Sequence, residues 1–482
     1  MKNFNLIDSP WIPVRNLDGE NRLVSLDTLF REASSIADLD CPPHERISLM
    51  RLLVCITQAE LGAPETADDW DDFGLDLETR IHAYLHRKDI HPHFNLFGDG
   101  PRFFQKIQNY DDISYPIAQI IYHFASGNNP TLLDHEGGQP RKLVPAFLAR
   151  SILAYQNFFV GGCMAAKVKG NGPALKFLNC LLIGPNLRST LLLNSLDKEI
   201  LDENFEKMGR PLWELSGKEQ TLETSSFLAR LSPLTCGLWI DEDGLRIRID
   251  QGIQSPEFPV QRDPFSTAYV KKDKRILLRA DIEKGIWRDL HLITLLKVVK
   301  AQDQQAPLNL QSHAFAFARH ECHFWLGEFV KAKDAKIIDA IESSFTVPFG
   351  MFTETGRARY QSGINHADRQ SNQLYGAVKQ YGVTMKNESP PTDLAKQHYW
   401  NALEQQHHLL LDIVRQDAPM AEDFGEGKDP WTQAVLQAAR AAYIHVCPRQ
   451  TPRQLQAFAI GLKVLSVKST TKKTSTRNPA TV

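Results

Sequence analysis

The spacing of apolar residues predicts short strands and separate helices in the first part of the chain, and mainly helices in its last part. From Pro43, apolar residues recur at the spacing of one helix face, and this pattern ends near Gly62. A second helix is predicted at 145–159, where a proline occupies the first turn and Gly161 and Gly162 close the far end. We also interpret 174–183 as a helix, because it is an apolar run between a proline and a glycine.

Strands are predicted between about residues 225 and 280. The segment LWIDEDGLRIRID alternates around an Asp-Gly pair, which indicates a hairpin. YVKKDKRILLRA resembles a second hairpin, with four basic residues at or near its tip: Lys271, Lys272, Lys274 and Arg275. A charged tip usually only faces solvent, but four basic residues around one acid also suit a contact with DNA.

Helical spacing returns at 287–300 and dominates the last hundred residues. Three amphipathic helices open at proline-containing caps and cover 390–415, 429–446 and 452–466. Together with an earlier helix near 370–387 they predict a four-helix bundle. The tail after it contains Ser, Thr, Lys and Arg without any acid, and is expected to be disordered.

Charge is segregated although the formal net charge of the 482 residues is only -2. Residues 1–80 carry sixteen acidic and seven basic residues, whereas 139–195 carry seven basic residues and no acidic one. Such segregation suits a subunit that binds a nucleic acid with one face and protein with another. The alternative is that the basic face is merely solvated.

The segment HFASGNNPTLLDH (123–135) combines turn formers with two adjacent leucines. Asn128 and Asn129 offer hydrogen-bond donors and acceptors at a stiff loop tip. Leu132 and Leu133 are apolar where a solvated loop would normally be polar. We expect this loop to meet a polyanion.

A second loop, CMAAKVKGNG, holds Lys167 and Lys169 among small residues. Its glycines, Gly170 and Gly172, allow a backbone to approach a phosphate or a groove closely. Helix capping is the alternative explanation for some of these glycines.

Catalytic motifs are not found in the sequence: it has no Walker loop, no GxSxG, no dinucleotide fingerprint and no paired-carboxylate nuclease signature. RHECH (319–323) would place His320 and His323 three apart on a helix, but a second ligand cluster is not evident. HRKDIHPHF (86–94) is rich in histidine but is interpreted as a turn. We therefore expect no catalysis, no metal and no cofactor.

Seven scattered cysteines without a C-x-x-C pair argue against a disulfide framework or a zinc ribbon, and indicate reduced, buried side chains. Apolar runs stay well below the ~18 residues that span a bilayer. The N-terminus has no secretory pattern, so a cytoplasmic location is expected.

Taken together, five segments make the chain resemble the large-subunit (CasA) family of the type I-E CRISPR surveillance complex, Cascade. They are FNLIDSPWIPVR at the start, MRLLVCITQA (50–59), GNNPTLLDH (127–135), NLRSTLLLN (186–194) and AKQHYWNALEQQ (395–406). The resemblance implies an α+β fold: a mixed α/β domain over 1–365 and a four-helix bundle over 366–466, followed by the basic tail 467–482.

The same resemblance implies a non-catalytic subunit with no cofactor. Its partners would be double-stranded target DNA, CRISPR RNA, the other Cascade subunits and a helicase-nuclease that is recruited on target binding, with no membrane. It would read the protospacer-adjacent motif, begin strand separation and R-loop formation, and serve antiviral defence. In such complexes the protein reads the motif while RNA pairing reads the sequence.

Site residues follow from the resemblance position by position. Asn128 and Asn129 would supply polar contacts, and Leu132 and Leu133 apolar ones. The family's glycine loop falls at Gly161 and Gly162, with Met164-Ala165-Ala166 in place of further glycines. Its lysine finger falls at Lys271 or Lys272, and its strand-separating wedge falls near Arg319, where the family has glutamine.

Two other functions stay open at this point. One is a metal-dependent nuclease or hydrolase that uses His320 and His323. The other is a structural scaffold whose basic faces, including Lys167 and Lys169, bind only guide RNA or protein.

Overall fold

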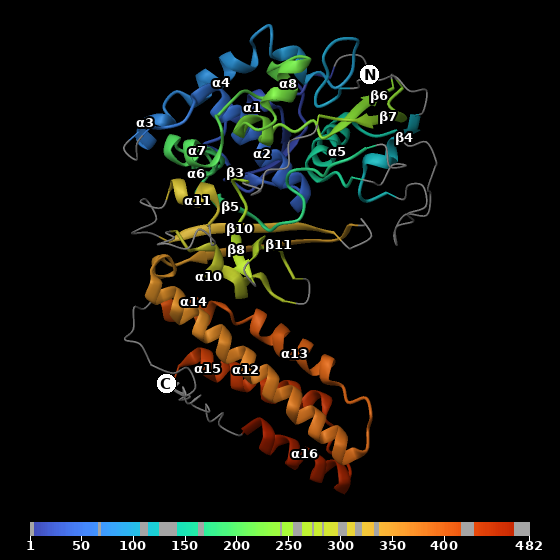
Figure 1. The fold of residues 1–482 in the computed structure, drawn as a ribbon, viewed down its shortest axis with the longest axis vertical. Coiled ribbons are helices and arrows are strands. Elements are labelled where there is room, and N and C mark those ends of the chain that lie inside the picture. Colours follow the sequence, from blue (N-terminus) through green and yellow to red (C-terminus); the bar gives the residue numbers. More distant parts are fainter. Residues whose placement is uncertain are drawn as a thin grey trace, which may run out of the picture. The chain divides into compact units, whose positions relative to one another are not determined.

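The computed structural model describes residues 4–65, 69–106, 114–124, 142–161, 168–241, 243–253, 263–271, 274–281, 284–296, 306–313, 321–331, 337–415 and 429–466. The chain divides into two compact units, Met1–Phe352 and Thr353–Val482. In the described residues, unit 1 mixes helices with four small sheets, and the regular elements of unit 2 are all helices (Figure 1). The mixed α and β composition expected from the sequence is therefore confirmed.

Helix α2 (Pro43–Leu61) is the central helix of unit 1. It packs against four helices and two strands: α4 (Leu77–Leu85), α5 (Pro145–Phe158), α6 (Leu187–Leu193), α9 (Phe227–Leu231), β10 (Cys322–Lys331) and β11 (Ile337–Val347). Proline at its first position and Gly62 at its C-cap, with φ of 83°, mark its ends. The helix predicted between Pro43 and Gly62 is thus confirmed.

The N-terminal sheet has the strand order β2-β1-β3, with both pairs antiparallel. Its strands are β1 (Ile12–Asn16), β2 (Asn21–Val24) and β3 (Ile36–Leu39). Helix α1 (Leu26–Arg31) joins the second strand to the third, and the Ser25 side chain caps its start. Trp11, at the start of the sheet, is fully buried and edges against Phe103.

A second antiparallel sheet has the order β11-β10-β5. It consists of β5 (Asn179–Ile183), β10 (Cys322–Lys331) and β11 (Ile337–Val347). The helix predicted at 174–183 is wrong, and so is the helix predicted at RHECH for its described residues. A short, continuous apolar run such as 179–183 is compatible with a buried helix or a buried strand. Here the run is buried and pairs with β10, so it forms a strand.

Both predicted hairpins are confirmed. β6 (Cys236–Ile240) and β7 (Arg246–Gln251) pair antiparallel across the Asp-Gly turn, and β4 (Ser114–Pro116) adds to the edge of β7. β8 (Ala268–Lys271) and β9 (Lys274–Leu277) form the two-stranded sheet.

The remaining helical segments of unit 1 surround these sheets. They are α3 (Trp70–Phe73), α4 (Leu77–Leu85), η2 (His91–Phe94), η3 (Ile117–Ile120), α5 (Pro145–Phe158), α6 (Leu187–Leu193), α7 (Lys198–Asn204), η4 (Leu212–Glu214), α8 (Lys218–Glu223), α9 (Phe227–Leu231), η5 (Ile286–Asp289), α10 (Leu290–Ile293), α11 (Leu308–Ser312) and η7 (Phe349–Phe352). Helix α5 matches its prediction. The helix predicted at 287–300 is shorter, because α10 ends at Ile293 and Thr294 is its C-cap.

Unit 2 begins at helix α12 (Glu354–Met385), whose N-cap Thr353 accepts a hydrogen bond from the Gly356 amide. The unit therefore starts earlier than the expected boundary after residue 365, which lies inside this helix. The other helices are α13 (Thr392–Glu404), α14 (His408–Arg415), α15 (Pro430–Val446) and α16 (Pro452–Ser466). The single helix predicted over 390–415 is two helices, separated by a turn at 405–407.

The described cysteines are all free thiols, and every one except Cys41 is buried, as expected. Within the described segments, no helix is both long and apolar enough to cross a membrane. The predicted tail 467–482 lies outside the described residues.

Candidate nucleic-acid interface

The β8–β9 hairpin places basic residues at opposing positions of its ladder. Lys271 pairs with Lys274 at the last register position of the described ladder. Lys274 is exposed. Like charges at directly opposing positions destabilise an antiparallel pair. The exposed Lys274 therefore places a positive charge at the end of the described ladder.

A buried ion-pair network holds the start of the hairpin segment. The two carboxylate oxygens of Asp263 accept hydrogen bonds from the Arg51 Nη1, at 3.0 and 2.9 Å, and the Arg230 Nε lies 3.1 Å away. The Arg51 and Asp263 side chains are fully buried. Burial lowers the pKa of Arg51, and the Asp263 carboxylate opposes that shift. This network ties the hairpin segment to α2 and α9.

A second buried carboxylate holds the other end of the hairpin. Glu328 of β10 accepts from the Ala280 amide at 2.6 Å and from the Arg279 Nε at 3.1 Å. Burial raises the pKa of Glu328, and these two hydrogen bonds act in the opposite direction. Ionic contacts therefore hold the chain both before β8, at Asp263, and after β9, at Arg279.

The glycine loop is closed at its base by a β-bridge between Val160 and Asn171. A Cβ on Gly161 would overlap the carbonyl oxygen of Gly170, and a Cβ on Gly172 would overlap that of Asn157. Two backbone segments approach so closely here that only glycine fits. Gly161 thus shapes the loop stem.

Lys169 lies on the outgoing side of this stem with an exposed side chain. Its backbone amide donates to the Gln251 side chain at 2.8 Å, at the end of β7. Lys169 is therefore held in place through its backbone while its ammonium group stays in solvent.

The loop stem and the hairpin base are fixed to the same short segment, which runs from Asn171 into β5. On this segment the Leu178 amide donates to the Leu278 carbonyl at 2.8 Å, and the Cys180 amide donates to the Phe265 carbonyl at 2.9 Å. Asn179 adds a β-bridge to Ser266. The fold thus brings together two basic elements that lie about a hundred residues apart in sequence.

The segment that leads into residues 125–141 is anchored by aromatic contacts. His44 of α2 stacks on Phe329 at 4.9 Å and meets the ring of His123 at 5.1 Å. Tyr122 packs edge-on against the same phenylalanine. Burial, and secondarily the proximity of His123, lowers the pKa of His44 to about 3. His44 is therefore a neutral aromatic support at neutral pH.

Helix α5 separates the end of residues 125–141 from the start of the glycine loop. At 1.5 Å per residue, its 14 residues are about 21 Å long. The two loops therefore join the chain at opposite ends of this helix.

The predicted site residues divide into two groups. Gly161, Lys169 and the backbone of Lys271 lie in the described structure, on the connected elements above. The others lie outside the described residues: Asn128, Asn129, Leu132, Leu133, Gly162, Lys167, Lys272 and Arg319.

The histidine pair considered for metal-dependent catalysis does not have the expected setting. His323 lies on strand β10, and its Nδ1 is 3.0 Å from the Thr346 hydroxyl on β11. His320 lies outside the described residues. The helical spacing that would have aimed both rings at one ion is wrong, because β10 begins at Cys322.

Sequence reasoning missed the ionic anchors of this region. Asp263 and Arg51 are separated by 212 positions, and each alone resembles a surface charge. Glu328 is an acidic residue within a largely apolar strand, CHFWLGEFVK. Because an acid in such a position is rarely buried without a partner, it was the sequence signal that pointed to a buried ion pair.

Comparison with known proteins extends these observations to the whole chain. The family model of CRISPR-associated protein Cse1 matches residues 5–442. CRISPR-associated protein CasA/Cse1 of Thermus thermophilus is 27% identical over 507 residues, covering 97% of this chain and 96% of the relative.

Solved structures share the fold. The crystal structure of Thermus thermophilus CasA matches with a TM-score of 0.77 at 21% identity, covering 96% of this chain and 98% of that one. Cse1 of Acidimicrobium ferrooxidans matches with a TM-score of 0.72 at 18% identity, over 96% and 97% of the two chains. A chain of a CRISPR RNA-guided surveillance complex matches with a TM-score of 0.73 at 18% identity, over 96% and 100%. The family match spans most of the chain, and the chain therefore belongs to the CRISPR-associated protein Cse1 family, the CasA-type large subunits.

Proposed function

We propose that this chain is the non-catalytic large subunit of a type I-E RNA-guided DNA surveillance complex, and that it recognises the protospacer-adjacent motif in duplex DNA. Family membership supports the assembly, together with the likeness to a chain of a surveillance complex. The observation that carries the DNA-reading role is the shared anchoring of the glycine-loop stem and the lysine hairpin on the Asn171–Ile183 segment.

Chemistry supports duplex DNA as the ligand of this surface. The exposed lysines of the two connected elements, Lys169 and Lys274, offer positive charge to phosphates. The minor groove presents a degenerate pattern of donors and acceptors, so contacts of this kind should tolerate several motifs.

The residues outside the described structure complete the proposal. Asn128 and Asn129 would make polar contacts, Leu132 and Leu133 apolar ones, and Arg319 would insert where strands separate. R-loop formation would follow, with CRISPR RNA, the other Cascade subunits and a recruited helicase-nuclease as partners in a cytoplasmic antiviral complex.

Unit 2 would serve as the family's C-terminal bundle. Helix α12 packs against α13, α15 and α16, and α13 packs against α15. Counting α13 and α14 as one broken helix, these contacts support a four-helix arrangement.

The test is a gel-shift titration of the reconstituted RNA-guided complex on duplexes that differ only in the adjacent trinucleotide. Binding should depend on the trinucleotide only when this chain is present. Lys271→Ala/Lys272→Ala should weaken binding and reduce the slope of log K against log salt by up to about 2, because each phosphate contact contributes about one unit. Asn129→Ala should weaken binding as well.

Lys198→Ala is the matched control. Lys198 is an exposed lysine of unit 1 that pairs with Glu65. Lys198→Ala also removes a positive charge, but Lys198 lies on α7 and not on the glycine loop or the hairpin. The binding curve of this variant should therefore be the same as that of the unmodified complex. If DNA binding depends on the trinucleotide to the same extent with and without this chain, the proposal that the chain reads the motif is wrong. A structural scaffold role would then replace it.

A further inference from the structure

Three histidines and two aspartates of unit 1 lie close together on elements that do not form the candidate nucleic-acid interface. His82 lies on α4, His86 is the C-cap of that helix, and His91 begins η2. The rings of His82 and His86 are 4.4 Å apart, and those of His86 and His91 are 5.6 Å apart. Asp27 of α1 and Asp8 of the N-terminal segment face them.

We propose that Asp27, His82 and His86 bind one divalent transition-metal ion with the preferences of Zn²⁺, with the fourth position open to solvent. The proposal is independent of the DNA-binding role. It also departs from our expectation of no metal, which treated residues 86–94 as a simple turn.

The geometry of this ligand set is close to what zinc requires. His82 and His86 are four residues apart, the spacing that places two imidazoles on one helix face toward one ion. The His86 Nε2 lies 3.5 Å from the Asp27 Oδ1. Two ligands of a tetrahedral zinc ion, each about 2.0–2.1 Å from it, are separated by roughly 3.4 Å.

The third separation is shorter, because a hydrogen bond holds it. The His82 Nδ1 is 2.5 Å from the same Asp27 oxygen. An ion on Nδ1 would take the place of the proton between these atoms, the neutral ring would carry its proton on Nε2 instead, and the His82 side chain, 49% exposed, has room to move outward.

Asp27 is already oriented for this role. Its side chain is only 12% exposed, and its other oxygen accepts from the Arg31 Nε at 3.0 Å. Partners of this kind fix a ligating carboxylate and tune its affinity. The Oδ1 atom is left facing the two histidines.

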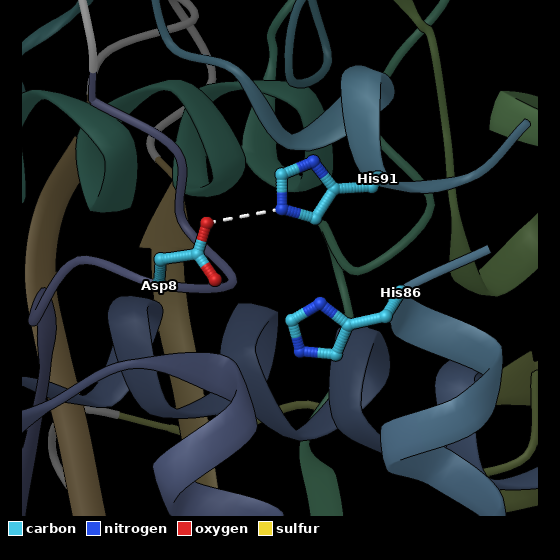
Figure 2. A group of neighbouring side chains, drawn as sticks. All are labelled: Asp8, His86 and His91. Atoms are coloured by element: carbon cyan, nitrogen blue, oxygen red, sulfur yellow. Dashed lines mark hydrogen bonds and ion pairs between the residues drawn. The ribbon is translucent and has the colours of Figure 1, made fainter. Parts of the chain in front are cut away.

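His91 and Asp8 form a second set around His86, which Figure 2 shows. We assign them a supporting role, because the Asp8 side chain is 53% exposed, whereas that of Asp27 is 12% exposed and already paired with Arg31.

The His91 Nε2 lies 3.0 Å from an Asp8 carboxylate oxygen, so these two side chains already pair with each other. Asp8 instead contributes negative charge beside the ion.

The test uses the full-length chain without a polyhistidine tag, stripped with a chelator and titrated with ZnCl₂ against a chromophoric competitor at about pH 7.5, where imidazoles are neutral. We expect one equivalent to bind. His82→Gln, His86→Gln and Asp27→Asn should each weaken the affinity at least about tenfold. Mg²⁺ should not compete, because imidazole ligands favour zinc.

His93→Gln is the matched control, since His93 lies on the same η2 helix but outside both ligand sets. It should bind as the unmodified chain does. Zinc should also raise the melting temperature of the unmodified chain by roughly 2 °C and leave that of His86→Gln unchanged. This comparison, with circular dichroism of each variant, separates lost binding from lost folding.

Two results would overturn the assignment. Equal zinc affinity of the unmodified and His86→Gln chains would leave the cluster as a set of hydrogen-bonded ion pairs. Loss of binding in Asp8→Asn and His91→Gln, with binding retained in His82→Gln, would place the ion in the other set.

Discussion

The pH dependence of stability should report on His44. This histidine is 4% exposed, and its Nδ1 lies among the buried atoms without a hydrogen-bond partner in the described structure. Its pKa is about 3 in the folded chain, against an ordinary value of 6.5. Between these values the unfolded chain binds a proton that the folded chain does not, so stability falls as pH drops below about 6.5.

At pH 5 the loss should reach about 2 kcal/mol relative to pH 7, at 1.36 kcal/mol for each pH unit. His44→Phe keeps a ring against Phe329 but removes the titration, so it should lack this part of the pH dependence. Buried His313, whose pKa is lowered to about 4, is present in both proteins and cancels from the comparison. Urea unfolding at the two pH values measures the difference, and identical pH profiles would contradict the burial of a neutral His44.

Asp263 should be among the costliest residues of unit 1 to replace. Asp263→Ala leaves the fully buried Arg51 and the largely buried Arg230 without their shared carboxylate. Breaking a buried ion pair from one side costs about 3–5 kcal/mol. We expect a loss of that size in urea unfolding, and Asp89→Ala, which removes an exposed partner of Arg87, should unfold at nearly the same urea concentration as the unmodified chain.

The glycine loop offers a test at the level of a whole element. In Gly161→Ala the new methyl group meets backbone atoms of Gly170, which cannot rotate away as a side chain can. Stability should fall by about 1–3 kcal/mol, the usual cost of overpacking. If the stem positions a DNA-reading loop, trinucleotide-dependent binding should also weaken.

Gly100→Ala is the control for that variant, because a Cβ there meets nothing within 4 Å. Its stability and binding should stay close to those of the unmodified chain. A stable Gly161→Ala chain with normal binding would show that the close approach is not required.

Elements with a local signal were predictable from the sequence, and elements defined by distant partners were not. Helix α5 has proline at its start, and the β6–β7 hairpin has an Asp-Gly turn, so residues close in sequence fix both. Strand β5 has no such signal. Its apolar run becomes a strand because β10, far away in sequence, supplies the hydrogen bonds.

The same distinction applies to the functional regions. The basic hairpin was visible because its charges are contiguous. The zinc-type cluster was not, because Asp27 precedes His82 by 55 positions and only folding brings α1 beside α4. Histidines close together in a sequence do not reveal which distant carboxylate will lie beside them in the fold.

The division of the chain into two compact units predicts two separate unfolding transitions. Gly461 of α16 packs closely in unit 2: a Cβ there would overlap the Tyr443 hydroxyl and lie 2.7 Å from the Ala377 carbonyl oxygen of α12. Gly461→Ala should therefore lower the transition of unit 2 by about 1–3 kcal/mol. The matched variant is Gly376→Ala, whose Cβ would lie 3.6 Å from a Val464 methyl carbon, an ordinary contact. It should stabilise α12 by up to about 1 kcal/mol through helix propensity.

Scanning calorimetry distinguishes two independent units from one cooperative body. Both glycine variants should move one transition, and Asp263→Ala should move the other, because Asp263 lies in unit 1 and the two glycines lie in unit 2. If Gly461→Ala and Asp263→Ala shift the same single transition, the two units unfold together. The substitutions of either core would then have to be judged against the stability of the whole chain.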